Sequence, residues 1–265
     1  MQEHRSEGIV RSIDPRGIAR IVIDRPAEHN TISAAVGAAL AQAIDDVIAA
    51  APRVVLLTGT GPVFCAGGDI GEFQAHAGAL DALVDGILSL LHPAIARLAA
   101  LPVPVVTALN GAVGGAGVGL ALCGDFALAA ASMKLRTGYA AIGLSPDAGA
   151  SWFLARRVGA LRARQLFFIS ETLDAPGCLA AGIVDGVFAD DGLMAQAQAL
   201  CERLAAAAPG ALAAVKRLCA GAAPLPLPDH LALEKALLEE RARSADAREG
   251  IAAFLARRAP VFRGD

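Results

Sequence analysis

Phe64-Cys65-Ala66-Gly67-Gly68-Asp69-Ile70 is one of two glycine-rich stretches that decide the fold of this chain. The other is Asn110-Gly111-Ala112-Val113-Gly114-Gly115-Ala116-Gly117-Val118-Gly119-Leu120. Each stretch follows an apolar run, so each predicts a turn from a buried strand into a helix. Unpaired N–H groups and the helix dipole favour negative charge at a helix start. Two such turns, brought together, would supply two N–H donors to one developing oxyanion.

Strand and helix patterns alternate around these two turns. Apolar runs predict strands at residues 18–24, 54–58 and 103–109. Thr31 and Ser33 are candidate N-caps for a helix that continues to about residue 50, and a second helix is expected at residues 80–100. Strands that alternate with helices predict an α/β fold with mostly parallel pairing.

The C-terminal part of the chain has a different character. We expect a core over residues 1–193 and a helical region over residues 194–265, broken at Pro209 and again around residues 224–228. Its last long helix is predicted to be amphipathic, from the spacing of Leu231, Glu234, Leu237 and Leu238. Such a tail is expected to pack on a neighbouring subunit.

Composition limits the classes of partner. The chain has 265 residues, 55% of them hydrophobic, which is enough for a full core. The formal net charge is −3, and no clustered excess of Lys and Arg predicts a nucleic-acid partner. The N-terminus is polar and charged and lacks the apolar segment of a secretion signal, so we expect a cytoplasmic protein.

An uncharged stretch over residues 98–124 has the length of a membrane span. Pro102, Pro104 and several glycines interrupt it, so it predicts a buried strand, turn and helix, and no membrane partner. The five cysteines are scattered and form no C-x-x-C pair, which predicts free thiols instead of disulfides or a metal site.

The second turn does not fit the common phosphate-binding motifs. Leu120 stands where a dinucleotide fingerprint would have its third glycine, and no Gly-Lys-Ser/Thr follows. A glycine-rich turn can also serve tight packing alone.

Five segments, taken together, are more specific. They are Ile23-Asp24-Arg25-Pro26-Ala27-Glu28-His29-Asn30, residues 64–70, residues 109–125, Ile142-Gly143-Leu144-Ser145-Pro146-Asp147, and the tail from residue 250 to residue 262. In this order and spacing they resemble the motifs of the crotonase (enoyl-CoA hydratase/isomerase) superfamily. The resemblance covers essentially the whole chain.

The resemblance implies a crotonase-like spiral of ββα units with a helical C-terminal trimerisation region, assembled as a homotrimer or hexamer. It implies an acyl-CoA thioester substrate and no permanently bound cofactor, because coenzyme A arrives as part of the substrate. The thioester oxygen would accept hydrogen bonds from the N–H groups of Gly68 and Ala116. The residues expected to contact coenzyme A are Arg25, Ala27, Ala66 and Ile70.

The resemblance also bears on the reaction. Hydratases of the family hold water between two glutamates, and the matching positions here are Gly119 and Tyr139. Neither glycine nor a tyrosine with a pKa near 10 replaces a carboxylate at neutral pH. Enoyl-CoA hydration is therefore the less favoured alternative.

Asp147 is the carboxylate that remains at a family acid/base position. Pro146-Asp147-Ala148-Gly149-Ala150-Ser151-Trp152 resembles the same block in double-bond isomerases and in the ring-epoxide isomerases of phenylacetate breakdown. One base suffices to move a proton between C2 and C4, so we expect an enoyl-CoA isomerase with Asp147 as its base. The alternative is that Asp147 caps a helix.

Two further alternatives stay open. Aryl-CoA dehalogenases of the family, which are hydrolases, use an aspartate nucleophile at the Asp147 position, an aromatic residue near Tyr139, and a histidine roughly where His92 lies. The protein could also be a non-catalytic acyl-CoA binder. Asp69 is expected to bind local backbone, and Trp152 is expected in the core.

Overall fold

The larger of two sheets forms the centre of the molecule. The computed structural model describes residues 3–222 and 224–265. Seven strands lie in the order β1-β2-β3-β4-β6-β8-β11. Their bounds are β1 (Glu3–Ser6), β2 (Ile9–Ile13), β3 (Ile18–Ile23), β4 (Val54–Gly59), β6 (Val105–Leu109), β8 (Phe126–Ala130) and β11 (Gly186–Phe188). The pairs β1–β2 and β2–β3 are antiparallel, and every pairing from β3 onward is parallel.

A smaller sheet carries the two glycine-rich turns. Its order is β10-β9-β7-β5, with bounds β10 (Leu173–Asp174), β9 (Lys134–Arg136), β7 (Ala112–Gly114) and β5 (Val63–Cys65). The pairs β5–β7 and β7–β9 are parallel. Three times the chain passes from a strand of the large sheet to a strand of the small sheet and then into a helix. The predicted spiral of ββα units is therefore confirmed.

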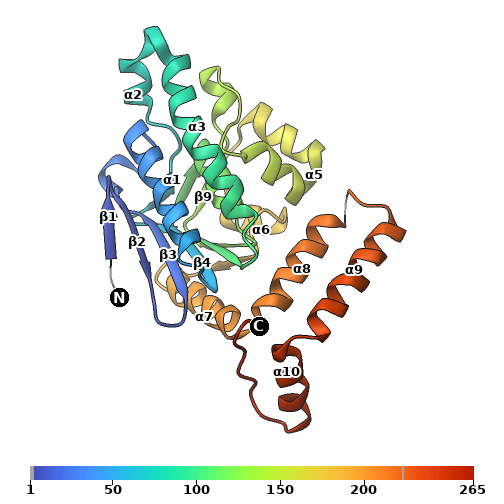
Figure 1. Ribbon diagram of the computed structural model, residues 1–265. Helices are drawn as coiled ribbons and strands as arrows, with labels where there is room; N and C mark the ends of the chain where they lie inside the picture. The colour runs from blue at the N-terminus through green and yellow to red at the C-terminus, as the bar shows by residue number, and fades with distance from the viewer. Residues whose placement is uncertain (1–2, 223) are drawn as a thin grey trace.

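Helices cover both faces of the large sheet (Figure 1). The α-helices are α1 (Ala34–Ala49), α2 (Ile70–Ala75), α3 (Leu80–Ala99), α4 (Ala116–Leu122), α5 (Ala150–Ile169), α6 (Ala175–Ala180), α7 (Leu193–Ala206), α8 (Pro209–Gly221), α9 (Leu227–Ala242) and α10 (Ala245–Leu255). Short 3-10 helices are η1 (Pro26–Glu28), η2 (Ala77–Ala79) and η3 (Tyr139–Ile142). Ser33 is the N-cap of α1, and its side chain accepts a hydrogen bond from the Val36 amide at 3.3 Å.

Burial on both faces explains the uninterrupted apolar run of β4. Val55 and Leu57 belong to the core shared with α1 and α3, whereas Val54 and Leu56 belong to the core shared with α7. A parallel strand covered on both sides loses the alternation of apolar and polar residues. The uncharged stretch over residues 98–124 forms β6, β7 and α4, as the sequence predicts.

The helical stretch Ala77–Ala99 is long and apolar enough, by length and composition, to cross a membrane. In this fold its buried side chains lie in the core that α1 also contributes to, and they include Ile87, Leu91, Ile95 and Leu98.

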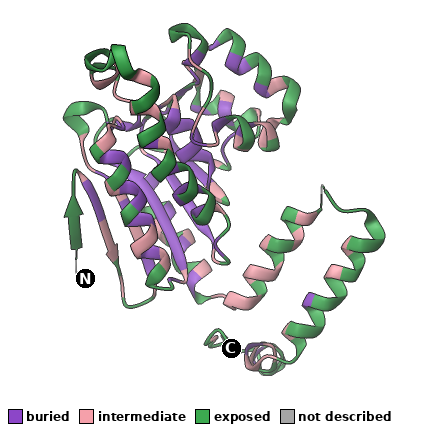
Figure 2. Ribbon diagram, turned by 45° about the horizontal axis from the view of Figure 1, so that its top comes forward, coloured by how far each residue is buried: buried purple, intermediate pink, exposed green. Residues whose placement is uncertain are grey.

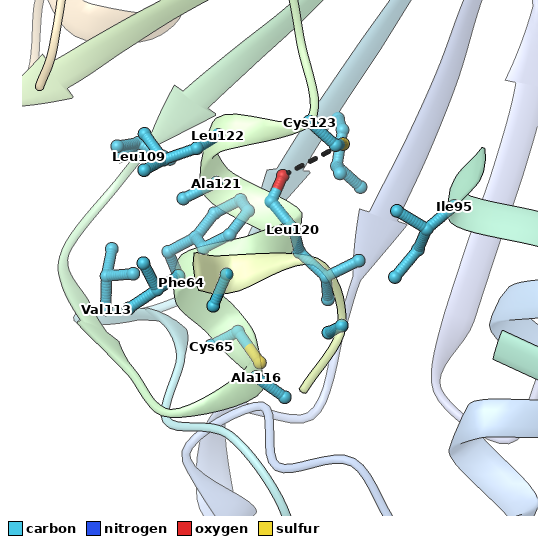
Figure 3. Close-up of a cluster of buried hydrophobic side chains, with 14 of the residues drawn as sticks. Phe64, Cys65, Ile95, Leu109, Val113, Ala116, Leu120, Ala121, Leu122 and Cys123 are labelled. Carbon is cyan, nitrogen blue, oxygen red and sulfur yellow. Dashed lines mark hydrogen bonds between the residues drawn. The ribbon is translucent and has the colours of Figure 1, made fainter. Parts of the chain in front are cut away.

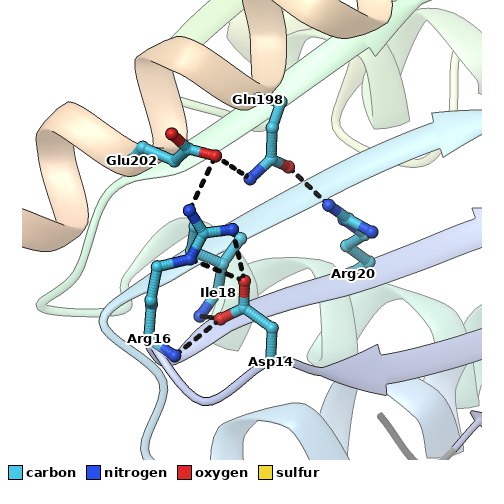
Figure 4. A network of polar contacts seen from close by, with 6 residues as sticks. All are labelled: Asp14, Arg16, Ile18, Arg20, Gln198 and Glu202. Atoms are coloured by element: carbon cyan, nitrogen blue, oxygen red, sulfur yellow. Dashed lines mark hydrogen bonds and ion pairs between the residues drawn. The ribbon is translucent and has the colours of Figure 1, made fainter.

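A polar network joins the β2–β3 turn to α7 (Figure 4). The Arg16 guanidinium contacts Asp14 and lies 2.8 Å from the Glu202 carboxylate. Gln198 donates to Glu202 at 2.8 Å and accepts from Arg20. Because Arg16 and Glu202 are substantially exposed, solvent screens their ion pair and it contributes little to stability. The apolar contacts of α7 are the main source of its attachment to the sheet.

Helices α8, α9 and α10 extend away from the sheets as an arm (Figures 1 and 2). The salt bridge between Lys216 and Asp125, at 2.8 Å, ties α8 to the body. The predicted helix containing Leu237 is confirmed as α9, but most of its apolar side chains are not covered within one chain. The exposed large side chains of the arm are Val215, Leu225, Leu227, Leu231, Leu238, Ile251, Phe254 and Leu255. An apolar surface of this kind typically marks an interface.

The close packing around α4 predicts opposite effects for two glycine-to-alanine changes. A β-carbon at position 117 would lie 2.2 Å from the Cys65 carbonyl oxygen, whereas one at position 86 would meet nothing within 4 Å. Gly117→Ala should therefore lower the free energy of unfolding by about 1–3 kcal/mol. Gly86→Ala, inside α3, should raise it by about 0.5–1 kcal/mol. Denaturant unfolding of both variants checks this, and equal effects would contradict it.

Candidate active site

A cavity of about 460 Å³ lies where the two glycine-rich turns meet. Its walls come from the first turn and α2, from α3, from the second turn, and from the segment between β9 and α5. The lining residues are Ala66, Gly68, Ile70, Phe73, Val84, Leu88, His92, Gly114, Gly115, Ala116, Arg136, Thr137, Gly138, Tyr139, Ala141, Ile142, Leu144, Ser145, Pro146 and Asp147.

The two turns touch backbone to backbone. Gly67 has φ +100°, and a β-carbon there would lie 2.9 Å from the Gly114 carbonyl oxygen and 3.2 Å from the Ala116 nitrogen. Only glycine combines that conformation with so close an approach. The contact brings Gly68 and Ala116 to the same cavity, as predicted from the sequence.

The amides of Gly68 and Ala116 are both unpaired. The bridge between the first turn and Ile32 uses the Gly67 carbonyl and the Asp69 amide, at 2.8 and 3.1 Å, and so passes over the Gly68 amide. Ala116 is the first residue of α4, where a helix leaves its N–H groups without intrahelical acceptors. Within residues 3–222 and 224–265 neither amide donates to a protein acceptor. Both residues line the cavity, so two backbone amides without a protein acceptor lie at its wall.

A dry cluster of side chains supports the turns (Figure 3). Phe64 and Leu120 are completely buried beneath them, and Cys65 lies beside Ala116. Burial raises the pKa of the Cys65 thiol to about 12, so this thiol is neutral at physiological pH. The cluster gives the open amides a rigid base.

The carboxylates of α2 serve local structure. Asp69 is the N-cap of α2 and accepts from the Glu72 amide at 3.0 Å, which confirms the structural interpretation of this residue. The Glu72 carboxylate accepts from the Ala34 amide at 2.9 Å, at the start of α1. Neither residue lines the cavity.

Asp147 lies in the cavity wall and is half-buried. The hydroxyl of Tyr139 donates to its Oδ1 atom at 2.5 Å. Burial raises the pKa of Asp147, while the hydrogen bond from Tyr139 acts in the opposite direction. The N-cap of α5 is Gly149, so the alternative that the Asp147 side chain caps this helix is wrong.

Tyr139 and His92 flank this carboxylate. Tyr139 is buried, packs against the Phe167 ring with centroids 6.1 Å apart, and keeps its proton because burial raises its pKa strongly. The Ala148 amide donates to His92 Nε2 at 3.0 Å. The Nε2 atom therefore carries no proton in this arrangement.

The position of one hydratase glutamate is filled by backbone. A β-carbon at position 119 would lie 2.1 Å from the carbonyl oxygen of Ala148. Ala148 is completely buried and has φ +49°, a left-handed conformation that is unfavourable for alanine. The loop after Asp147 thus occupies the space that a longer side chain at position 119 would need.

The residues expected to contact coenzyme A fall into two groups. Ala66 and Ile70 line the cavity, and Ile70 is 55% exposed. Arg25 and Ala27 do not line it, but their segment is attached beside it, because the Ala66 amide donates to the His29 carbonyl oxygen at 3.2 Å. The structure therefore brings these two segments together at one side of the cavity.

Some features of the site escaped the sequence analysis. Arg136 lines the cavity, with its Nε atom donating to the Ser170 carbonyl oxygen at 3.1 Å. Ile142 and Leu144 belong to one of the five family-like segments and form part of the apolar wall, a role that the sequence analysis did not assign to them. No local pattern marks Arg136 as a cavity residue. The expectation that Trp152 lies in the core is wrong, since it is 58% exposed and stacks under the Arg156 guanidinium at 4.6 Å.

Comparison with known proteins places the chain in a family. Residues 14–265 match the model of the enoyl-CoA hydratase/isomerase family. A 1,2-epoxyphenylacetyl-CoA isomerase from Escherichia coli is 36% identical over 94% of this chain and 96% of its own length. A "probable enoyl-CoA hydratase" from Rhodobacter capsulatus is also 36% identical, over 94% and 95% of the two chains.

Solved structures support the same family assignment. The crystal structure of an enoyl-CoA hydratase from Polaromonas sp. JS666 matches with a TM-score of 0.88 and 32% identity, over 96% of this chain and 99% of that one. The family match, the two relatives and the shared fold lead to one conclusion: this chain belongs to the enoyl-CoA hydratase/isomerase family and has the crotonase fold.

Proposed function

We propose that this protein is an enoyl-CoA isomerase that uses Asp147 as its single acid/base. The family acts on acyl-CoA thioesters, and the substrate brings its own coenzyme A. The observation that carries the proposal is the number of carboxylates in the cavity wall. Among the residues the structure describes, Asp147 is the only carboxylate that lines the cavity into which the two unpaired amides open.

The mechanism follows from these groups. The thioester oxygen accepts hydrogen bonds from the Gly68 and Ala116 amides. Asp147 removes a proton from C2 or C4, and negative charge develops on that oxygen, where oriented donors stabilise the enolate most. Asp147 then returns the proton to the other end of the conjugated system. The double bond moves and no water is consumed.

Two observations support isomerisation over hydration. Adding water requires a second acid/base group, but Gly119 and Tyr139 stand at the positions of the hydratase glutamates, and of these two only Tyr139 lines the cavity. The space beside Gly119 is filled by the Ala148 carbonyl. The relatives carry both names, and the E. coli relative is named as an isomerase of an epoxide, so ring-epoxide thioesters belong in any substrate panel.

The environment of His92 weighs against dehalogenase-like hydrolysis. That reaction needs an imidazole whose free nitrogen can take a proton from water. His92 Nε2 is occupied by the Ala148 amide. A binder without catalysis would not need a buried carboxylate beside two open amides, because burial penalises its charge.

We also propose that the arm of α8–α10 builds a homotrimer, alone or paired as a hexamer. The exposed apolar side chains of the arm support this, among them Leu238 at 72% and Phe254 at 83% exposure.

The base is tested by Asp147→Asn. This change keeps the shape of the side chain and its acceptor for the Tyr139 hydroxyl but removes the base. It should lower kcat on a 3-enoyl-CoA by about 10²–10⁴-fold, the usual contribution of a general base. Thermal melting and thioester binding should change little. Full activity in this variant would refute the assignment.

The missing second acid is tested with crotonyl-CoA. The protein should hydrate it far below the roughly 10–1,000 per second of an efficient enzyme. Gly119→Glu should not create a hydratase, because the new side chain collides with the Ala148 carbonyl, and it should lower the melting temperature. Rapid hydration by the unmodified protein, or by the variant, would count against isomerisation.

The assembly is tested by light scattering at micromolar concentration. The protein should run as a trimer or hexamer. Leu238→Glu combined with Phe254→Glu places charges on the arm and should give smaller species with native circular dichroism. A monomer in the unmodified protein would disprove the proposed assembly.

A further inference from the structure

The base sits beside a strained turn. Ala148 and Gly149 both have positive φ, at +49° and +76°, and Ala148 is completely buried. Alanine is unfavourable in this left-handed conformation because its β-carbon crowds the backbone. Such a residue persists only when its surroundings hold it there. The groups that hold Ala148 in this conformation also affect the position of the Asp147 side chain.

His92 holds the turn from the α3 side. Its Nε2 atom accepts the Ala148 amide at 3.0 Å, so the one polar hydrogen of the strained residue has a partner. A buried N–H group without an acceptor would destabilise the turn, because the group loses its hydrogen bond to water and gains none in return. His92 therefore stabilises the strained turn and couples α3 to the loop that carries the base.

Tyr139 holds the same loop at two points. Its carbonyl oxygen accepts the Leu144 amide at 3.1 Å, and its hydroxyl donates to Asp147 Oδ1 at 2.5 Å. Hydrogen bonds with Tyr139 thus hold both ends of the segment from Leu144 to Asp147. The Phe167 ring beside Tyr139 keeps the phenol in place.

One oxygen of Asp147 is occupied and the other is open. Oδ1 accepts from Tyr139, whereas no residue in the described ranges donates to Oδ2. A carboxylate held through one oxygen cannot rotate freely, so the second oxygen keeps a constant direction relative to the two amides. Effects of this kind are large, because a reacting group misplaced by about 1 Å can lose about 10²-fold in rate.

None of the other groups near Asp147 holds its Oδ1 atom as the Tyr139 hydroxyl does. Cys65 is a neutral thiol beneath the site, and the Nε2 atom of His92 is engaged by the Ala148 amide. Arg136 lines the same cavity but is bound to the Ser170 carbonyl. The hydrogen bond from Tyr139 lowers the pKa of Asp147 most strongly against the cost of burial, and the electrostatic interaction with His92 acts in the same direction to a smaller extent.

We propose that Tyr139 and His92 are positioning residues for the base, Tyr139 by holding one carboxylate oxygen and His92 by holding the strained turn that follows it. This rests on the proposed function, in which Asp147 moves the proton. It assigns a role to the tyrosine that stands in place of a hydratase glutamate. No proton passes through either residue during the reaction.

Tyr139→Phe is the decisive variant. It keeps the ring packing and removes the hydroxyl, so kcat on a 3-enoyl-CoA should fall about tenfold or more with little change in KM. The acid limb of the pH profile of kcat should move to higher pH. The sign follows from the lost hydrogen bond, which lowers the pKa of Asp147 in the unmodified protein.

Two matched controls separate positioning from packing. Phe167→Leu loosens the packing around Tyr139 but keeps its hydroxyl, so the acid limb should stay in place. His92→Leu removes the acceptor for the Ala148 amide and should lower kcat, and His92→Gln, which retains an acceptor, should restore part of it. Equal shifts of the acid limb in Phe167→Leu and Tyr139→Phe would overturn the role of the hydroxyl.

A measurement independent of turnover completes the test. Carboxyl ¹³C NMR titration reports the pKa of Asp147 directly, and it should be higher in Tyr139→Phe than in the unmodified protein. An unchanged pKa would overturn the proposal. A raised pKa with unchanged kcat would also overturn the positioning role, yet would leave Asp147 as the base. Failure of the base itself appears separately, as an active Asp147→Asn.

Discussion

The close approach of two main-chain turns is the constraint on which the rest of the structure depends. Gly67 lies against Gly114 and Ala116, and Gly117 lies against the carbonyl of Cys65, at distances that no side chain tolerates. This contact aligns β5 with β7 and places the Gly68 and Ala116 amides at one cavity. In the proposed mechanism these donors are positioned before substrate arrives, so no reorganisation is required when charge develops on a thioester oxygen.

In the proposed mechanism, one loop decides which chemistry the shared frame supports. Between Gly143 and Gly149 the chain fills the space beside Gly119 with backbone and places a single carboxylate in the cavity wall. The family includes relatives named as hydratases and as isomerases, which is consistent with this division of labour. We propose that the frame supplies oxyanion stabilisation and that the loop supplies the proton transfer.

Much of this was predictable from the sequence, for identifiable reasons. The β4 run and the two glycine-rich turns carry strong local signals, because burial on both faces and close backbone contact each restrict the residue types allowed. The hydrogen bond from Tyr139 to Asp147 and the one from Ala148 to His92 were not predictable. They depend on a left-handed alanine and on a contact between α3 and a distant loop, which leave no periodic pattern. Trp152 was misplaced because hydrophobic character does not by itself imply burial.

The two amides at the cavity belong to the main chain, and this bears on how such a protein changes over generations. Every residue except proline at position 116 supplies the same N–H group, so most substitutions there keep the donor. In the proposed mechanism the base, in contrast, depends on a single codon. Under that proposal, mutation can exchange the acid/base groups while activation of the thioester is inherited intact. A descendant with a new reaction would then start from an enzyme that already stabilises the enolate, and not from an inert scaffold.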